Sequence, residues 1–491
     1  MQIIDFINNL FWGYFLIAAL VICALWFTFR TRAVQFGMQR EMIHVLKGED
    51  TKTADDAAAK AATTDDTFAE HAPRPKEKRK ISSFEAFVVG LASRIGTGNL
   101  AGVASAIIVG GPGAVFWMWV MAVFGAATAF VESTLAQLFK VKGKDSFVGG
   151  PAYYMERGLK KPWMGALFAL LLIFGFAMAN QLVQSNTICS AMQGAFGWNA
   201  SIIGIVLTVV TLLIIFGGIQ RIARFSSIVV PVMAVGYILL ALTVTIINIK
   251  ALPGALRLII DSAFGVRQFA GGGIGATIMM GVKRGLFSNE AGEGSAPNAA
   301  ATATTSHPVK QGLIQALGVF TDTLIVCSCT AFIILCSGVD INGGAEGIQL
   351  TQLALTSQIG PAGGIFVAVA ILFFAYSSII GNYYYGEVNL RFIVRKRSEA
   401  TRRRSLFIFR LASSGMVMVG ALISVSAAWS LIDLSMALLT TCNLVAIVFL
   451  GKYAFRLLDD YRAQRKRGIS SPTFNKHDIF PDIADDLEGW D

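Results

Sequence analysis

Charged residues are scarce in this sequence of 491 residues, and that scarcity excludes a soluble protein. Only 15% of the residues are charged and 54% are hydrophobic, whereas a soluble domain carries about 25% charged residues. Eleven apolar stretches are long enough to cross a bilayer, which takes roughly 17 to 25 helical residues. They are apolar on every face, unlike the alternating segments of a β-barrel. The sequence therefore predicts an all-α polytopic membrane protein.

Cysteine and histidine are also few, and neither forms a pattern that carries chemistry. The six cysteines lie in apolar stretches, where they are small core residues. The pair Cys327-x-Cys329 has no nearby histidine and cannot complete a tetrahedral zinc site. The four histidines lie in loops or at span ends, and no Gly-x-x-x-x-Gly-Lys-Ser/Thr motif is present, which argues against a membrane-embedded enzyme and an ATP-driven pump. We therefore expect a protein that is not an enzyme.

The apolar stretches divide into one extra helix and two groups of five. The predicted spans are residues 11–29, 84–109, 113–138, 163–191, 200–217, 226–248, 268–303, 311–337, 361–389, 406–427 and 430–451. The first gives an N-terminal transmembrane helix within 1–30, and a cytoplasmic linker follows over 31–81. Five spans in each group give the groups opposite orientations, so we expect inverted repeats over 82–248 and 268–451, followed by a cytoplasmic tail over 452–491.

The basic residues are concentrated in the loops on one side of the membrane. Of the 41 Lys and Arg residues, 34 lie in these loops, and the opposite loops hold only Lys250, Arg257 and Arg267. Because Lys and Arg remain cytoplasmic, we predict a multi-pass protein of the bacterial inner membrane with its N-terminus outside and its C-terminus in the cytoplasm. The lipid bilayer explains the net charge of +10 without a nucleic-acid partner. The polar end of the chain, 470–491, is expected to be loosely held.

Each predicted repeat opens with a long span that is interrupted near its middle. The first break covers residues 93–99 and the second covers 285–297. Their Gly and small polar residues weaken a helix by up to roughly 1 kcal/mol each, and matching breaks in two repeats point to the substrate site of a transporter. The helix ends at a break suit a carboxylate and a cation, so a zwitterionic amino acid with a coupling cation fits them. Close helix packing at glycine is the alternative.

Four sequence blocks resemble the signature of the alanine or glycine:cation symporter family. They are residues 95–104 (IGTGNLAGVA), 110–119 (GGPGAVFWMW), 149–154 (GGPAYY) and 284–292 (RGLFSNEAG). The resemblance covers residues 82 to about 450. It implies a leucine-transporter-type (LeuT-like) fold with one extra N-terminal helix, and inward transport of a small neutral amino acid together with sodium.

The resemblance also implies a substrate site between the two breaks and the helices that face them. Of the polar residues Gln181, Gln184 and Asn186 in the fourth span, the family suggests a glutamine, and we favour Gln184. The implied substrate-binding residues are Thr97, Gly98, Asn99, Gln184, Phe287, Ser288, Asn289, Gly292, Ser378 and Asn382.

The ninth span departs from the family pattern at Asn382. Family members commonly carry Thr-x-x-x-Trp before a Tyr-Tyr-Gly-Glu run, whereas this chain has Ser378 and Asn382 at those two positions. Replacing an indole by an amide would open the pocket, and a buried amide costs roughly 1–3 kcal/mol to leave unpaired. Glutamine is therefore a candidate substrate beside alanine and glycine. The alternative is that Asn382 bonds a neighbouring helix and does not contact the substrate.

A sodium site between the second and ninth spans is implied by the same fold. Its ligands would be the backbone carbonyls of Ala92 and Ile95 and the hydroxyls of Ser377 and Ser378, an all-oxygen set that suits a hard cation. The alternative is that the serines bond back to their own helix. Proton coupling through Asp322 is a further alternative, and an ion channel built from broken helices is a less favoured one.

Charged residues inside the spans need partners, because an unpaired charge there costs at least about 2.5 kcal/mol. We predict two sets of pairs, namely Arg94 with Glu132, and Lys283 and Arg284 with Glu290 and Glu293.

Overall fold

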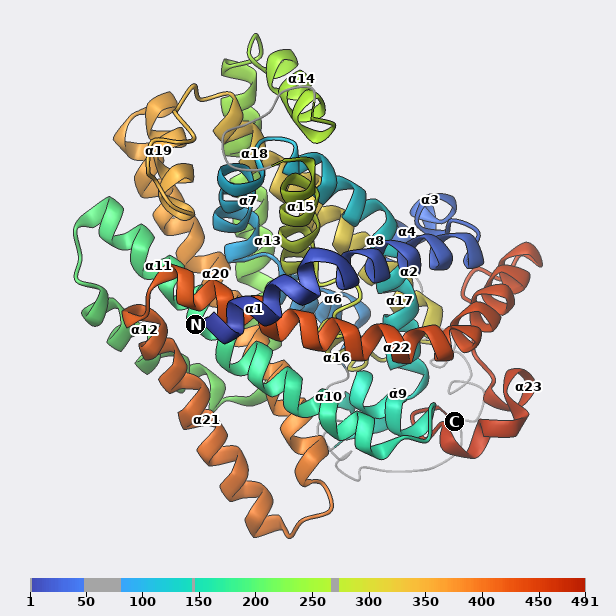
Figure 1. Cartoon of the computed structure of the whole chain (residues 1–491). Helices are drawn as coiled ribbons and strands as arrows, with labels where there is room; N and C mark the ends of the chain where they lie inside the picture. Colours follow the sequence, from blue (N-terminus) through green and yellow to red (C-terminus); the bar gives the residue numbers. More distant parts are fainter. Residues whose placement is uncertain (1, 48–80, 144–145, 266–272, 491) are drawn as a thin grey trace, which may run out of the picture.

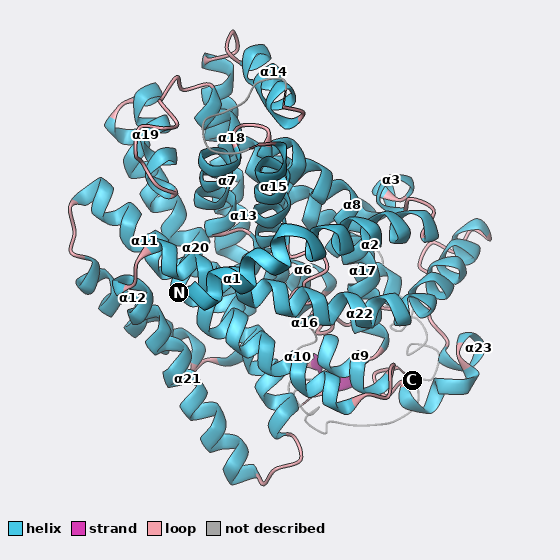
Figure 2. Cartoon of the chain, viewed as in Figure 1, coloured by secondary structure: helices cyan, strands magenta, loops and turns pink. Residues whose placement is uncertain are grey.

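The structure, a computed structural model, describes residues 2–47, 81–143, 146–265 and 273–490. This part of the chain is helical apart from loops and one antiparallel hairpin, β1 (Val141–Lys142) with β2 (Phe147–Val148) (Figure 2). Within it, eight helices are long and apolar enough to cross a membrane, or up to nine if a pair bent by 47° is one span. The all-α class is therefore confirmed. Most of the predicted linker, 48–80, lies outside the described residues.

The first predicted repeat corresponds to a run of helices that starts at a capped N-terminus. The Ser82 hydroxyl accepts from the Glu85 amide and the Glu85 carboxylate accepts from the Ser82 amide, so two backbone groups are satisfied where the helix begins. The elements are α6 (Ser83–Arg94), η2 (Gly98–Gly102), α7 (Val103–Gly110), α8 (Ala114–Leu138), α9 (Pro151–Arg157), α10 (Pro162–Phe174), η3 (Gly175–Asn180), α11 (Gln181–Phe196), α12 (Ala200–Ile215) and α13 (Gly218–Ile247). With 16 residues, α12 is shorter than the span predicted there.

The second predicted repeat follows the same order after a connecting helix, α14 (Leu252–Ala263). Its elements are α15 (Ile274–Asn289), α16 (Pro297–Ala300), α17 (Pro308–Val319), η4 (Phe320–Cys327), α18 (Ser328–Leu335), α19 (Ile348–Ile359), α20 (Pro361–Val394), α21 (Glu399–Leu422) and α22 (Val425–Lys466). The sequence did not predict α14 and α19, which both lie at the same end of the bundle (Figure 1). Each has only 12 residues, too few for the length of apolar run that marks a span.

The N-terminal helix is longer than predicted and lies along α22. It runs from residue 2 as α1 (Gln2–Leu10), η1 (Phe11–Phe15) and α2 (Leu16–Arg30), and α1 lies against the N-terminal part of α22 (Figure 1). The Trp12 indole donates to the Asp433 carbonyl at 3.0 Å, and the Asn8 amide donates to the Ser430 carbonyl at 3.0 Å. Two short helices follow, α3 (Val34–Gly37) and α4 (Gln39–Leu46), so the predicted linker starts as folded chain.

The end of the chain is packed against the protein, and the expectation of a loose segment over 470–491 is wrong for the described residues. It forms α23 (Lys476–Ile479) and η5 (Pro481–Asp486). The buried Trp490 indole donates to the Gln137 carbonyl at 2.9 Å, and the Lys140 ammonium lies 4.1 Å and 4.2 Å from the ring centres of Phe147 and Trp490. Burial lowers the pKa of Lys140 to about 7. A few spaced aromatic residues thus anchor a polar segment.

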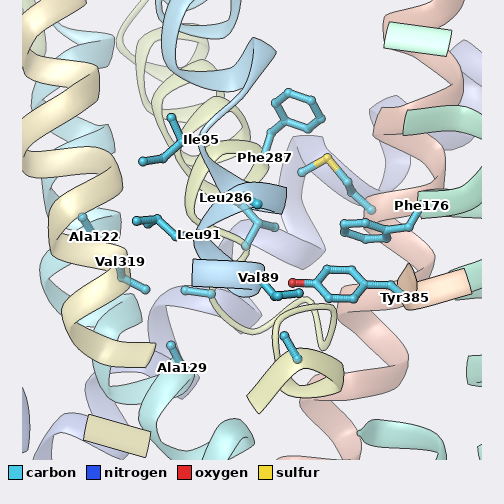
Figure 3. Packing of buried hydrophobic residues seen from close by; sticks show 14 of the residues in the cluster. Val89, Leu91, Ile95, Ala122, Ala129, Phe176, Leu286, Phe287, Val319 and Tyr385 are labelled. Carbon is cyan, nitrogen blue, oxygen red and sulfur yellow. The ribbon is translucent and has the colours of Figure 1, made fainter. Parts of the chain in front are cut away.

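Helix α6 lies at the centre of the molecule, which positions the first break. It contacts α13, α15, α16, α17 and α20, and its residues from Ala86 onward are buried. Figure 3 shows Leu91 and Ile95 directed toward Ala122 and Val319, while Phe176 and Tyr385 lie together on the other side. The first break is therefore held from several directions by close packing.

Candidate functional site

The first break is a short extended segment that is closed by its own side chains. Helix α6 ends at Arg94, and Ile95 has φ −74° and ψ 97°, which turns the backbone out of the helix. The side-chain oxygen of Asn99, Oδ1, accepts from the Gly96 backbone amide at 2.9 Å. A Cβ at Gly96 would collide with the Ser378 hydroxyl and lie 3.0 Å from Gln184 Oε1. Glycine is therefore required where these three segments meet.

The second break begins later than predicted, because α15 continues to Asn289. The irregular stretch runs over 290–296, where Glu290 has φ 57° and Gly292 and Gly294 have φ 93° and 85°. The side-chain oxygen of Asn289, Oδ1, accepts from the Ala291 backbone amide at 3.0 Å. An asparagine side chain thus closes each break, in the way such side chains close turns.

The two breaks touch each other near Asp322 of η4. A Cβ at Gly98 would lie only 3.0 Å from the Cα atom of Ser288. The Asn99 amide donates to Asp322 Oδ1 at 2.7 Å, and the Ser288 hydroxyl donates to Asp322 Oδ2 at 2.7 Å. One carboxylate thus links the first break to the last turn of α15, directly before the second break.

Gln184 is the polar residue of α11 that faces the first break. Its Oε1 atom accepts from the Thr97 amide at 3.1 Å and from the Thr97 hydroxyl at 2.8 Å. Gln181 instead donates to the Ile379 carbonyl at 3.0 Å, and Asn186 donates to the Ile423 carbonyl at 2.7 Å. Of the three residues weighed from the sequence, only Gln184 therefore contacts the break.

The four predicted sodium ligands converge where α20 passes the first break. The Ser378 hydroxyl lies 3.0 Å from the Ala92 carbonyl and 3.3 Å from the Ile95 carbonyl, and the Ser377 hydroxyl lies 3.3 Å from the Ala92 carbonyl. Both hydroxyls also reach the Phe374 carbonyl of their own helix, at 2.8 Å and 3.2 Å. They can therefore bond back to α20 or turn toward α6, and their oxygens suit a hard cation.

Two predicted substrate residues lie apart from the others. Asn382 is buried beside α6, with its Oδ1 atom 2.7 Å from the Ser93 hydroxyl, and its Nδ2 atom has no partner among the described residues. Gly292 lies against α8 and α22, where its amide donates to Glu132 Oε1 at 3.1 Å and its carbonyl accepts from Asn443 at 2.9 Å. The first break, Gln184, Phe287 and Ser288 thus lie together, and Asn382 and Gly292 are separate from them.

Comparisons with known proteins assign the chain to a family. The model of the sodium:alanine symporter family matches residues 1–476. The chain belongs to the sodium:alanine symporter family. This symporter is 47% identical over 475 residues to the probable sodium/glutamine symporter GlnT of Bacillus subtilis, an alignment that covers 97% of this chain and 93% of that relative. It is 46% identical over 478 residues to the amino-acid carrier protein AlsT of Bacillus subtilis, covering 97% and 95%.

A solved structure of a Na⁺-coupled sialic acid symporter in a substrate-bound outward-open state has a similar fold. The TM-score is 0.53 at 14% identity, and the match covers 94% of this symporter and 96% of that chain. The likeness confirms the predicted LeuT-type fold. Members of the family are transporters and not enzymes, so this chain is a membrane transporter of the amino-acid:cation symport class.

The predicted pairing of Lys283 and Arg284 with glutamates of the second break is wrong. Arg284 donates to both oxygens of Asp433, at 3.0 Å and 3.2 Å, and the Lys283 ammonium lies 2.7 Å from Asp433 Oδ2. The glutamates contact other groups, because the carboxylate of Glu290 accepts from Ser295 at 2.5 Å. Sequence spacing suggested a local pair across one or two turns, but both cations point toward α22, which lies more than a hundred residues away in the chain.

The predicted pair between Arg94 and Glu132 also does not form among the described residues of this symporter. Arg94 donates to the Gln315 carbonyl at 3.2 Å, and Glu132 accepts from the Gly292 amide and, at 2.8 Å, from the Asn443 amide.

Asp322 is the site residue whose role the sequence predicted least completely. The signal was a carboxylate in an apolar span, and it was interpreted only as a proton carrier.

Proposed function

We propose that this protein is a sodium-coupled symporter that imports a small neutral amino acid of the alanine and glycine class by alternating access. The observation that carries the proposal is the arrangement at the first break. Ser378 approaches the Ala92 and Ile95 carbonyls. Only two residues after Ile95, the Thr97 amide donates to Gln184. A cation and an amino acid bound there would be neighbours. The excess of basic residues in one set of loops supports an orientation in the bacterial inner membrane with the N-terminus outside.

The substrate would lie between the two breaks with its carboxylate at the first. The Thr97 amide and hydroxyl now bond Gln184, and a substrate carboxylate would replace that oxygen as acceptor at the start of η2, where the helix dipole favours an anion. Gln184, released from Thr97, would turn to the substrate. Phe287, whose ring lies 5.0 Å from that of Trp429, would form the apolar wall beside Ser288 and Asn289.

Sodium would bind between α6 and α20 through the Ala92 and Ile95 carbonyls and the Ser377 and Ser378 hydroxyls. The two carbonyls lie at the C-terminus of α6, where exposed carbonyls favour a cation. Binding would only require the two hydroxyls to turn their lone pairs inward. Proton coupling is the second candidate, because the buried Asp322 carboxylate links the first break to the end of α15.

Glutamine is the larger candidate substrate. Support comes from the unpaired Nδ2 atom of Asn382, one turn along α20 from Ser378, and from the relative that is named a probable sodium/glutamine symporter. A side-chain amide that reaches Asn382 would satisfy this buried donor.

The test is uptake of labelled alanine, glycine and glutamine into liposomes that contain the purified protein. An inward sodium gradient is compared with potassium and with a proton gradient. We expect sodium-dependent, saturable uptake that is lost in Ser378→Ala and retained in Ser133→Ala, a matched control whose buried hydroxyl on α8 has no partner among the described residues. Uptake driven only by the proton gradient would refute sodium coupling and favour the role of Asp322.

The same uptake assay shows which amino acid the protein transports. Glutamine uptake that exceeds alanine uptake and falls in Asn382→Trp would support the contact of Asn382 with the substrate. Alanine or glycine uptake that is unaffected by Asn382→Trp would exclude that contact and leave Asn382 as a packing partner of Ser93.

A further inference from the structure

A cavity of about 680 Å³ lies away from the breaks, at the face that carries most of the basic loops. It is bordered by the C-terminal part of α20, the first half of α21, Tyr153 of α9 and the β1–β2 hairpin. Six cationic side chains line it, namely Lys142, Arg391, Arg395, Arg402, Arg403 and Arg410. Neither the substrate site nor the sodium site uses any of them.

The cations of this cavity exceed the carboxylates that neutralise them. Glu387 pairs with Arg391 at 2.6 Å and lies 3.7 Å from Arg410. Glu399 pairs with Arg403 at 2.5 Å, and Arg395 pairs with Glu156, which does not line the cavity. Among the described residues, five arginines of the cavity thus face three carboxylates, and such a surplus of one sign attracts an anion.

Two side chains in the cavity have polar groups with no partner among the described residues. The Arg402 guanidinium forms no hydrogen bond or ion pair there. Tyr384, a residue only 5% exposed, lines the same cavity, and its buried hydroxyl also has no partner among the described residues. An unpaired buried donor is unfavourable, and a phosphate oxygen would accept from it while the planar guanidinium groups bind the other oxygens in pairs.

The cavity opens toward the apolar surface of α21. Val394, Leu406 and Phe407 line it beside the cations. Phe407 is 52% exposed, and Ile408 and Leu411 continue this exposed apolar surface along the helix. Arginines that precede an apolar, outward-facing stretch match a molecule with an anionic head and hydrocarbon tails, and basic pockets between membrane helices bind such head groups.

We propose that this cavity binds the phosphate group of an anionic molecule, with an anionic phospholipid as the source that the apolar border favours. The phosphate accepts from the Tyr384 hydroxyl and from Arg402, and the acyl chains lie along Phe407. A soluble phosphate ester shares the head-group chemistry but gains nothing from the apolar border.

Calorimetric titration of the full chain in detergent tests this site. The probes are dioctanoyl phosphatidylglycerol, dioctanoyl phosphatidylcholine and glycerol phosphate. We expect phosphatidylglycerol to bind at least about tenfold more tightly than phosphatidylcholine. We also expect Arg402→Gln combined with Tyr384→Phe to weaken that binding by about tenfold or more. Arg404→Gln is the matched control, because Arg404 is the second residue after Arg402 on α21 but does not line the cavity.

The three probes identify the source of the bound phosphate group, and two outcomes would overturn the proposal. Weak binding of glycerol phosphate assigns the site to a lipid, whereas equally tight binding assigns it to a soluble phosphate ester. Equal binding of the two lipids would overturn the proposal, as would an Arg404→Gln effect as large as that of the double variant. Elution of each variant as a single symmetric peak in size exclusion shows that a loss of binding is not a loss of fold.

Discussion

The Asp433 carboxylate is the buried counter-ion of two cations, and its removal gives the largest stability change that we predict. The side chains of Lys283, Arg284 and Asp433 are 12%, 6% and 6% exposed. Arg284 makes two parallel bonds to the carboxylate, at 3.0 Å and 3.2 Å, and Lys283 makes one at 2.7 Å. Asp433→Asn keeps the shape but removes the charge. One of the two oxygens remains as an acceptor.

The magnitude follows from the charges left behind. Breaking a buried ion pair by removing one partner costs about 3–5 kcal/mol. Because two cations lose their counter-ion, we expect a loss near the upper end of that range for Asp433→Asn. Asp459→Asn is the matched control on the same helix: its contact with Arg32 is 3.9 Å long and largely exposed, and an exposed pair contributes about 0–1 kcal/mol.

The assay is equilibrium unfolding in mixed micelles with increasing sodium dodecyl sulfate, followed by loss of tertiary signal from tryptophan. A second variant, with Lys283→Met, Arg284→Met and Asp433→Leu together, removes the charges along with their desolvation cost and should recover most of the stability. The reasoning is refuted if Asp433→Asn falls within about 1 kcal/mol of Asp459→Asn, or if the triple variant is no more stable than Asp433→Asn.

Three further predictions concern the site and the end of the chain. Gly96→Ala should lower the apparent sodium affinity in uptake at least about tenfold, because the added Cβ collides with the Ser378 hydroxyl; an unchanged sodium dependence would contradict this. Asp322→Asn should reduce uptake at least about tenfold while the protein still elutes as a single peak, and normal uptake would exclude a role for the charge. Docking of the segment around Trp490 should strengthen as pH rises from 7 toward 10.5, because burial lowers the pKa of Lys140 from 10.5 to about 7 and the undocked state then binds the extra proton. Protection factors from amide hydrogen exchange in this segment should therefore rise with pH in the native chain, and they should not rise in Lys140→Met.

The sequence was sufficient to predict the architecture because membrane helices are encoded by long, simple signals. A run such as 361–389 is apolar over its whole length and forms α20, since a helix is the structure that satisfies its backbone within the bilayer. Shorter elements do not have this signal. The sequence reading treated the segment 470–491 as loose, because its composition is polar and its anchoring depends on Trp490 meeting Gln137 and Lys140 from distant parts of the chain.

The position of the first break was predictable because it depends on the backbone, whereas the partners of the buried charges were not. Gly96 and Gly98 indicated the break because helices disfavour glycine, and the choice of Gln184 over Gln181 agrees with the contacts of the two side chains. Partners of buried charges followed no local rule. Spacing along α15 suggested that Arg284 pairs with a glutamate of the second break, whereas the structure pairs it with Asp433, a residue 149 positions away in the chain.

Coupling between cation and substrate follows from the proposed function and the shortness of the first break. The Ile95 carbonyl would bind sodium and the Thr97 amide would bind the substrate carboxylate, so the two ligands act on backbone groups only two residues apart. Fixing one residue of an irregular segment costs about 1–2 kcal/mol of conformational entropy. The ligand that binds first bears this cost for both, and the second binds more tightly to a break that is already ordered. Because such coupling is reciprocal, sodium raises the affinity for the amino acid by the same factor as the amino acid raises the affinity for sodium. Gly96 lies between the two groups, where a side chain would separate α6 from Ser378 and Gln184 together.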